Sequence, residues 1–232
     1  MDIALTTSLG VEFDRVEKRF GALLALRKVT LRIAPGEFVA LFGPNGSGKT
    51  TLLRMAALLV RPSAGRVTHL GAEGRGAGEI RGQIGLVGHK ALVYDELTAR
   101  ENLGFFARLY GVSRPAERIS RVLDAVGLRQ RADDVAGVFS RGMRQRLAIA
   151  RALITEPRLL LFDEPATGLD RQGRDWLDRT LDGLHDAGAT VIVSTHDDSL
   201  AALAARSVHL DAGRVVRDTA ASAVPLAPEA RR

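Results

Sequence analysis

The segment from Gly43 to Thr50 constrains the fold of this chain more than any other part of the sequence. It reads GPNGSGKT and fits the pattern G-x-x-x-x-G-K-[S/T] at every position. A continuous apolar run of strand length, 38–42, comes directly before it, and the pattern of 51–58 after it is typical of a helix. This order of buried strand, glycine loop and helix predicts a phosphate-binding loop, in which backbone N–H groups and a helix N-terminus surround phosphate oxygens.

The residue types of the loop predict a site for Mg-ATP. Lys49 supplies a positive charge for the β and γ phosphates, and the Thr50 hydroxyl can coordinate Mg²⁺. A glycine-rich turn that matches by chance is the alternative, and the strand and helix on either side argue against it. The predicted nucleotide-binding residues of this segment are Gly43, Pro44, Asn45, Gly46, Ser47, Gly48, Lys49, Thr50 and Thr51.

Two adjacent acids, Asp163 and Glu164, follow the apolar run 159–162. Parallel α/β sheets present their ligand sites at the carboxyl ends of buried strands, where these acids are expected. Asp163 would hold Mg²⁺ directly or through water, and Glu164 would take a proton from the water that attacks the γ phosphate, or orient that water. Alone, such a strand end is usually only a solvated surface. Because these acids follow a phosphate loop in the sequence, they predict a catalytic pair.

A third motif, FSRGMRQR at 139–146, makes the chain resemble the ABC ATPases, whose signature is usually written LSGGQ followed by a basic stretch. Ser140 and Gly142 match that signature, whereas Arg141 and Met143 depart from its commonest form. The resemblance implies that Ser140, Gly142 and the N-terminus of their helix contact the γ phosphate of ATP held by a second subunit, so that the active form is a homodimer with ATP at its interface. Without the family, the same stretch is an arginine-bearing amphipathic helix.

The resemblance assigns three more residues. Phe20 takes the place of the aromatic residue that stacks on adenine, the alternative being a core phenylalanine. Asp170, in the stretch TGLD at 167–170, belongs to the loop that couples the two sites of the dimer, and it can also cap the following helix. His196 matches the switch histidine that senses the γ phosphate and would hold the attacking water with Glu164; a lone histidine is more often structural.

His89 is a departure from the family, which normally has glutamine at the end of the strand 83–88. Imidazole offers a nitrogen rather than the oxygen that Mg²⁺ prefers, so His89 is assigned to the nucleotide site without a settled contact: direct, through water, or toward a partner. The stretches at 88–89 and 97–103 resemble the ATP-binding subunits of the haem exporter of cytochrome c maturation.

The arrangement of patterns along the chain predicts its architecture. Alternating residues at 11–16 and 28–33 predict an antiparallel edge, and 71–82 reads as loop. Thr98 and Glu101 match a capping box at the start of a helix through 109, a second helix is expected near 119–126, and Ser140 is the expected N-cap of a helix to 154. The mostly apolar stretches 158–162 and 190–194 predict two further strands. The resemblance implies a P-loop NTPase core of ABC ATPase type, with an N-terminal antiparallel β subdomain and an inserted helical subdomain. We expect a single domain with an α/β core at 11–87 and 156–217, a helical insertion at 88–155 and a tail at 218–232.

Composition limits the other functions. The absence of cysteine excludes a disulfide framework and any thiolate metal site. No secretion signal is expected, and charged or polar residues interrupt every apolar stretch well short of the ~18 residues of a spanning helix. A membrane role must therefore come through a partner. The net charge of +6 could attract nucleic acid, but the basic residues are scattered among 27 acids, so we expect a solvated surface and no nucleic acid.

These expectations combine into one function. The chain would be the ATP-hydrolysing subunit of a membrane exporter, peripheral on the cytoplasmic face of the inner membrane. ATP-driven closure of the dimer would act on a separate transmembrane permease, with haem as a candidate cargo. A drug, lipid or polysaccharide exporter subunit would share every ATP motif, and a soluble ABC ATPase outside transport is the remaining alternative.

Overall fold

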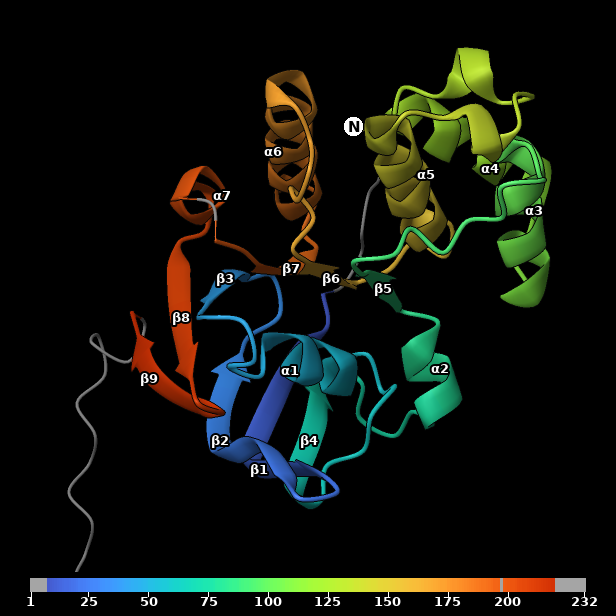
Figure 1. The fold of residues 1–232 in the computed structure, drawn as a ribbon. Helices are drawn as coiled ribbons and strands as arrows, with labels where there is room; N and C mark the ends of the chain where they lie inside the picture. The colour runs from blue at the N-terminus through green and yellow to red at the C-terminus, as the bar shows by residue number, and fades with distance from the viewer. Residues whose placement is uncertain (1–7, 197, 220–232) are drawn as a thin grey trace, which may run out of the picture.

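The structure, a computed structural model, describes residues 8–196 and 198–219, which form two sheets, seven α-helices and two short 3-10 helices (Figure 1). The larger sheet has the order β5-β6-β7-β3-β8-β9 and is parallel except for β9, which pairs antiparallel with β8. The smaller sheet, β2-β1-β4, is antiparallel. The strands are β1 Gly10–Phe20, β2 Leu23–Ile33, β3 Phe38–Phe42, β4 Ala64–Leu70, β5 Ile84–Val87, β6 Leu159–Asp163, β7 Thr190–Ser194, β8 Arg206–Asp211 and β9 Arg214–Asp218.

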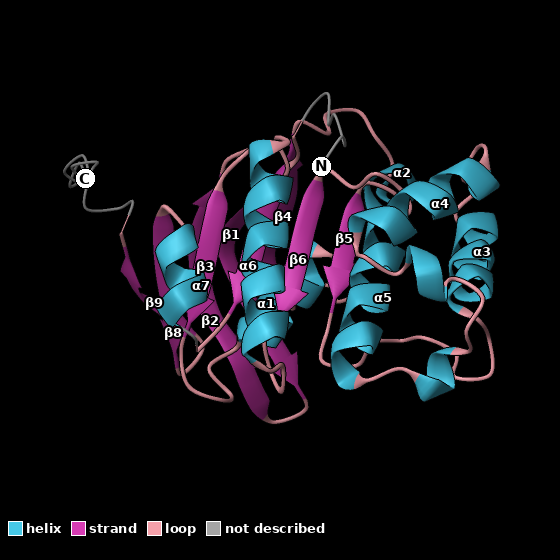
Figure 2. Ribbon diagram, turned by 90° about the horizontal axis from the view of Figure 1, so that it is seen from above, coloured by secondary structure: helices cyan, strands magenta, loops and turns pink. Residues whose placement is uncertain are grey.

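Helices cover both faces of the larger sheet (Figure 2). Alternate residues of each central strand belong to different cores: Phe38 and Ala40 face the helices α5 and α6, while Val39 and Leu41 face α1 and the smaller sheet. Because both faces are covered, β6 and β7 are buried along their whole length. The helices are α1 Lys49–Ala56, α2 Ala77–Arg81, α3 Ala99–Leu109, α4 Pro115–Ala125, α5 Arg141–Leu153, α6 Arg171–Asp186 and α7 Asp198–Leu203.

Helices α3, α4 and α5 gather beside β5, at one end of the larger sheet (Figure 1). The predicted capping box starts α3, since Thr98 accepts a hydrogen bond from the Glu101 backbone and Glu101 accepts one from the Thr98 backbone. Ser140 caps α5 through a hydrogen bond from the backbone N–H of Met143, as predicted. Apolar residues on facing sides of the three helices form one continuous core with the sheet, among them Leu103, Val122, Leu123 and Leu147.

The segment 88–98 joins β5 to α3 without a helix of its own and is tied to α5 by an ion pair. Arg144 Nη1 lies 2.7 Å from Asp95 Oδ1, and Arg144 Nη2 donates to the carbonyl of Gly137 at 3.1 Å. The backbone N–H of Gly137 in turn donates to Asp95 O at 2.9 Å. The buried side chain of Asn102 holds the same segment to α3 by donating to the carbonyls of Tyr94, Leu97 and Thr98.

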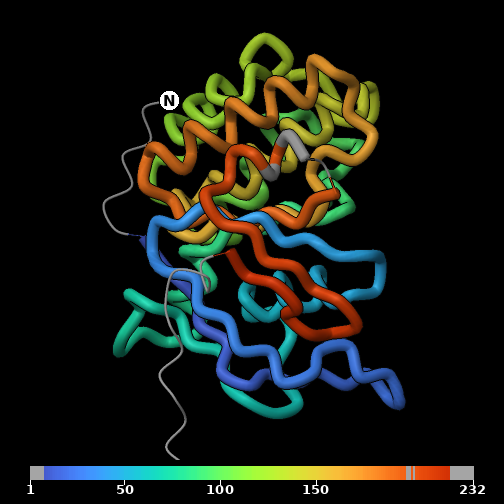
Figure 3. Tube along the Cα trace, turned by 90° about the vertical axis from the view of Figure 1, so that its left-hand side faces the viewer, coloured from blue at the N-terminus to red at the C-terminus, as the bar shows by residue number. Residues whose placement is uncertain are grey.

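The structure corrects the expected element boundaries in the first third of the chain. The residues 71–82 are not all loop, because 77–81 form the short helix α2. Strand β4 had no counterpart in the prediction; it pairs with β1, and its mostly exposed residues lack an apolar pattern. Both β1 and β2 extend to the turn at Gly21, and Figure 3 shows the hairpin β8–β9 beside β2, where Arg27 N donates to Gly213 O at 2.8 Å. Of the predicted tail, residues 220–232 lie outside the described residues.

Candidate functional site

The loop between β3 and α1 leaves its polar groups available for an anion. Gly48, the N-cap residue of α1, has a φ of 107° and provides no side-chain cap, so the first N–H groups of the helix have no side-chain acceptor there. Ser47 Oγ is buried and has no hydrogen-bond partner within the described part of the chain. A buried hydroxyl without a partner is costly, and a phosphate oxygen in the loop would satisfy it. These features fit the predicted phosphate site.

Lys49 stands almost fully buried beneath the loop, with 5% of its side chain exposed. Its Nζ donates to the carbonyls of Gly43 at 2.6 Å and Pro44 at 3.3 Å, and it lies 3.4 Å from His196 Nε2. Among the described residues, the nearest carboxylate is that of Glu164, whose Oε1 is 3.9 Å from Nζ. The structure therefore brings the lysine of the loop together with two residues predicted from distant parts of the sequence.

Thr50 and Asp163 meet where α1 begins and β6 ends. Thr50 Oγ1 donates to Asp163 Oδ2 at 2.8 Å, and Ser194 Oγ, at the end of β7, donates to Asp163 Oδ1 at 2.8 Å. Neighbouring oxygen ligands of an octahedral Mg²⁺ are about 3 Å apart, because each Mg–O bond is about 2.1 Å long. The spacing of the Thr50 and Asp163 oxygens thus fits the ion. Ser194 was missed from the sequence, although a polar residue ending a buried strand beside this site is a usable signal.

Glu164 has an unusual backbone conformation that its neighbours hold in place. Its φ of 52° lies in the left-handed region, where a residue other than glycine is strained. Its backbone N–H points at Ser194, 3.1 Å from the carbonyl oxygen and 3.0 Å from Oγ. The two carboxylate oxygens have different neighbours: His196 Nε2 lies 3.2 Å from Oε1, and His89 Nε2 lies 3.8 Å from Oε2.

Phe20 ends β1 on the surface, with 49% of the residue exposed, so the core alternative for this ring is wrong. Lys18 Nζ lies 5.0 Å from the ring centroid on one face and donates to the carbonyl of Arg61. An exposed aromatic ring is available for stacking on a base.

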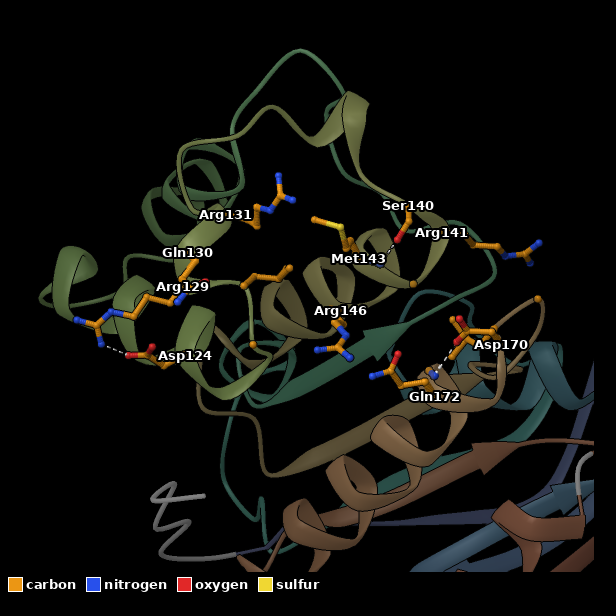
Figure 4. Close-up of a pocket in the computed structure, with 16 residues that line it drawn as sticks. Asp124, Arg129, Gln130, Arg131, Ser140, Arg141, Met143, Arg146, Asp170 and Gln172 are labelled. Atoms are coloured by element: carbon orange, nitrogen blue, oxygen red, sulfur yellow. Dashed lines mark hydrogen bonds and ion pairs between the residues drawn. The ribbon is translucent and has the colours of Figure 1, made fainter.

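Ser140, Gly142 and Asp170 line a separate cavity of about 800 Å³ (Figure 4). It lies between the start of α5, the segment 124–131 and the start of α6, and none of its described lining residues belongs to the phosphate loop. Asp170 caps α6 by accepting from Gly173 N at 2.7 Å, which confirms its capping role. Burial lowers the pKa of Arg146 in this cavity, and the charge of Arg179 lowers it further. The predicted nucleotide residues therefore divide into two groups on one chain.

Arg141, the residue that departs from the usual signature, packs against the loop before α6. A Cβ on Gly168 would lie 2.2 Å from its Cζ, so a side chain at this position would displace the guanidinium of Arg141. Gly168 has a φ of 72°, which also favours glycine. The arginine is thus accommodated by a neighbour without a side chain.

The sequence profile of the ABC transporter family matches residues 26–167, which include the phosphate loop, the signature segment and both acids. The chain belongs to this family. It is an ABC-type ATP hydrolase coupled to transport, and it binds ATP in a P-loop α/β fold with an antiparallel β subdomain and a helical subdomain. No helix in residues 8–196 and 198–219 has the length and apolar character needed to cross a membrane.

Three relatives of this ABC ATPase are named for different transport roles. A daunorubicin resistance ATP-binding protein of Streptomyces coeruleorubidus is 40% identical over 90% of this chain and 67% of its own. A Nod factor export ATP-binding protein of Paraburkholderia xenovorans is 36% identical over 92% and 72%. A sulfate/thiosulfate import ATP-binding protein of Bordetella bronchiseptica is 42% identical over 89% and 61%.

The fold of this ABC ATPase is also that of a solved ATP-binding cassette, a dimer in a post-hydrolysis state bound to ADP and phosphate. The two structures align with a TM-score of 0.79 at 32% sequence identity, over 90% of this chain and 97% of the other.

Proposed function

We propose that this chain works as a homodimer in an ABC exporter, peripheral on the cytoplasmic face of the inner membrane and bound to a separately encoded transmembrane permease. The division of the nucleotide residues into two groups carries the proposal. Lys49, Thr50 and Asp163 form one group, while Ser140 and Gly142 line another cavity. A second copy can bring its signature group to the first, and the solved cassette that shares this fold is a dimer. Two relatives are named for drug resistance and for export.

In the proposed site, the loop 43–50 and Lys49 bind the phosphates of ATP, Phe20 stacks on adenine, and Ser140 of the partner subunit contacts the γ phosphate. Thr50 and Asp163 hold Mg²⁺, which neutralises phosphate charge when it is bound. Donors that converge on the γ phosphate are attracted more strongly as charge develops on it. Closure of the dimer therefore completes the site, and opening after hydrolysis releases the products.

Glu164 accepts the proton of the attacking water or orients that water. Its Oε1 lies beside His196 Nε2 and near Lys49 Nζ, so the carboxylate is turned toward the phosphate loop. His196 shares the attacking water with Glu164. Asp170, at the other cavity, belongs to the loop that couples the two sites.

Substitution of Glu164 by Gln tests the catalytic assignment. The amide keeps the shape of the side chain but cannot take a proton at neutral pH, so steady-state ATP hydrolysis should fall at least about a hundredfold. ATP binding should remain, and size-exclusion chromatography with Mg-ATP should show a stable dimer. Glu79→Gln, at an exposed acid of α2, is the matched control. Hydrolysis at the wild-type rate in Glu164→Gln would remove Glu164 from catalysis.

A partly exposed group of aromatic rings is the candidate contact for the permease. We define the aromatic surface as Tyr94, Phe105, Phe106 and Tyr110, whose neighbouring ring centroids are 5.2 to 6.5 Å apart. Tyr94 and Tyr110 are about half exposed. An exposed aromatic patch on a protein without a membrane-spanning helix in its described residues suits a cytoplasmic segment of a membrane partner.

Tyr94→Asp tests this contact. Co-expressed with the membrane proteins encoded beside its gene, the wild-type chain should fractionate with membranes. The Asp variant should remain in the supernatant, because a charge in an apolar contact is costly, while its ATP hydrolysis persists. Val216→Asp changes another exposed apolar residue, at β9 on the opposite edge of the larger sheet, and should not alter fractionation. Equal loss in both variants would count against the aromatic surface.

The class of cargo that we propose is based on the names of the relatives reported above. The relatives reported above are named for drug resistance, Nod factor export and sulfate import, and none of these three names haem. The narrower resemblance to haem exporters at 88–89 and 97–103 therefore has no support from them. We propose export of a drug-like or other organic molecule ahead of haem export, and cytochrome-assembly genes beside this one would reverse that order.

A further inference from the structure

We propose that His89 is a positioning residue for Glu164, which it holds by carboxylate oxygen Oε2, rather than a ligand of Mg²⁺. This inference rests on the catalytic role proposed for Glu164. The carboxylate lies between two imidazoles from different elements: His196, after β7, contacts Oε1, and His89, after β5, approaches Oε2. Each oxygen thus has its own nitrogen neighbour.

The backbone near Glu164 is held in place by its neighbours, so the Glu164 carboxylate can change direction only by rotation of the side-chain torsions. Asp163 is held by Thr50 and Ser194, and the N–H of Glu164 is held by Ser194. Only 19% of the Glu164 side chain is exposed. A nitrogen beside each carboxylate oxygen, at 3.2 Å for His196 and 3.8 Å for His89, favours one plane of the carboxylate and hence one direction from which a water can approach it.

The cavity beside His89 explains why Oε2 needs a donor. This cavity of about 280 Å³ is lined by Glu164 and by three cations, Lys90, Arg141 and Arg144, and Glu164 is the acid among its described lining residues. A carboxylate released from His89 can turn toward these cations and away from the phosphate loop. An imidazole that turns an N–H toward Oε2 would oppose that rotation.

The contacts of His89 separate it from the predicted ion site. In the described residues, no hydrogen bond or ion pair joins His89 to Thr50 or Asp163, whose oxygens contact each other at 2.8 Å. With 62% of its side chain exposed, His89 is not held by packing, so substitutions there should leave the fold intact. Glutamine, the usual residue of the family at this place, also has an N–H donor at the end of its side chain.

The test compares His89→Ala, His89→Gln and Lys90→Ala by steady-state hydrolysis at varied ATP and Mg²⁺. Loss of the imidazole that lies 3.8 Å from Oε2 should lower the kcat of His89→Ala about tenfold, because the carboxylate would then be less well oriented. The KM for ATP and the half-saturating Mg²⁺ concentration should stay within about twofold, because the nucleotide and ion contacts are untouched. His89→Gln should recover most of the rate. Lys90→Ala, which removes a neighbouring cation without a contact to Glu164 among the described residues, should behave as wild type.

The double variant His89→Ala/Glu164→Gln gives the decisive comparison in single-turnover measurements. If His89 acts through Glu164, its removal adds no further loss once the carboxylate is gone. The proposal would be overturned if the rate losses of the two single variants multiplied in the double variant, or if His89→Ala needed a higher Mg²⁺ concentration. Hydrolysis that depends on Glu164 but not on His89 would overturn this inference alone, whereas hydrolysis independent of Glu164 would overturn the catalytic assignment as well.

Discussion

Gly43 shows how a single position makes the phosphate loop possible. Its φ is 144°, and a Cβ there would lie 2.1 Å from the carbonyl oxygen of Leu210 and 2.7 Å from Ser47 Oγ. The first contact is with backbone of β8, which cannot move without disturbing its pairing with β3. The loop therefore depends on a hydrogen atom where any other residue has a side chain.

Gly43→Ala should lower the free energy of unfolding by at least about 2 kcal/mol, through backbone strain and the clash with Leu210. Gly76→Ala is the matched control, since Gly76 has a φ of −75° and no atom within 4 Å of an added Cβ. At such a compatible site the change is neutral or stabilises by up to about 1 kcal/mol. Urea unfolding of the two variants gives the comparison, and equal stabilities would mean that the loop tolerates a Cβ.

Spacing in the sequence was enough to predict that Thr50 would meet Asp163 and that Lys49 would lie near Glu164, because parallel strands bring their carboxyl ends to one edge of a sheet. The spacing could not predict the directions in which the side chains point. The sequence placed His89 near the nucleotide, but the contact with Glu164 depends on a loop conformation and a rotamer that no motif encodes.

At the scale of elements, prediction followed the strength of the apolar pattern. The buried strands β3, β6 and β7 and the capped helices α3 and α5 were expected, since periodicity and caps mark them. The exposed edge strand β4 was not, because its partner β1 rather than its own pattern makes it a strand.

Arg118 is an element-scale feature that the sequence did not reveal. It lies on α4, and its buried guanidinium donates to the carbonyls of Leu153 and Ile154 at the end of α5 and pairs with Glu156 at 2.6 Å. Burial lowers the pKa of Arg118, and the charge of Glu156 opposes that shift. A cation at a helix C-terminus complements the helix dipole, so α4 both packs on α5 and completes its end.

At the scale of the whole molecule, the proposed homodimer would bring together the two separate groups of predicted nucleotide residues. Mixing Lys49→Ala with Ser140→Ala tests this arrangement, because a dimer of the two has one site with both defects and one site with neither. Each variant alone should be inactive, and a 1:1 mixture should recover up to about a quarter of the wild-type hydrolysis rate, since half of the dimers are mixed and each has one intact site. A mixture as inactive as its components would place Lys49 and Ser140 in the same subunit's site.

The ion pair between Asp95 and Arg144 connects the segment that follows β5 to the beginning of α5. Asp95 follows Tyr94 of the aromatic surface, and Arg144 lies one helical turn beyond Ser140. Gly137 is hydrogen-bonded to both residues, which further restricts their relative movement. In the proposed complex, a force applied by the permease at Tyr94 would reach the start of α5 through this ion pair, and a movement of α5 would be transmitted back to the permease in the same way.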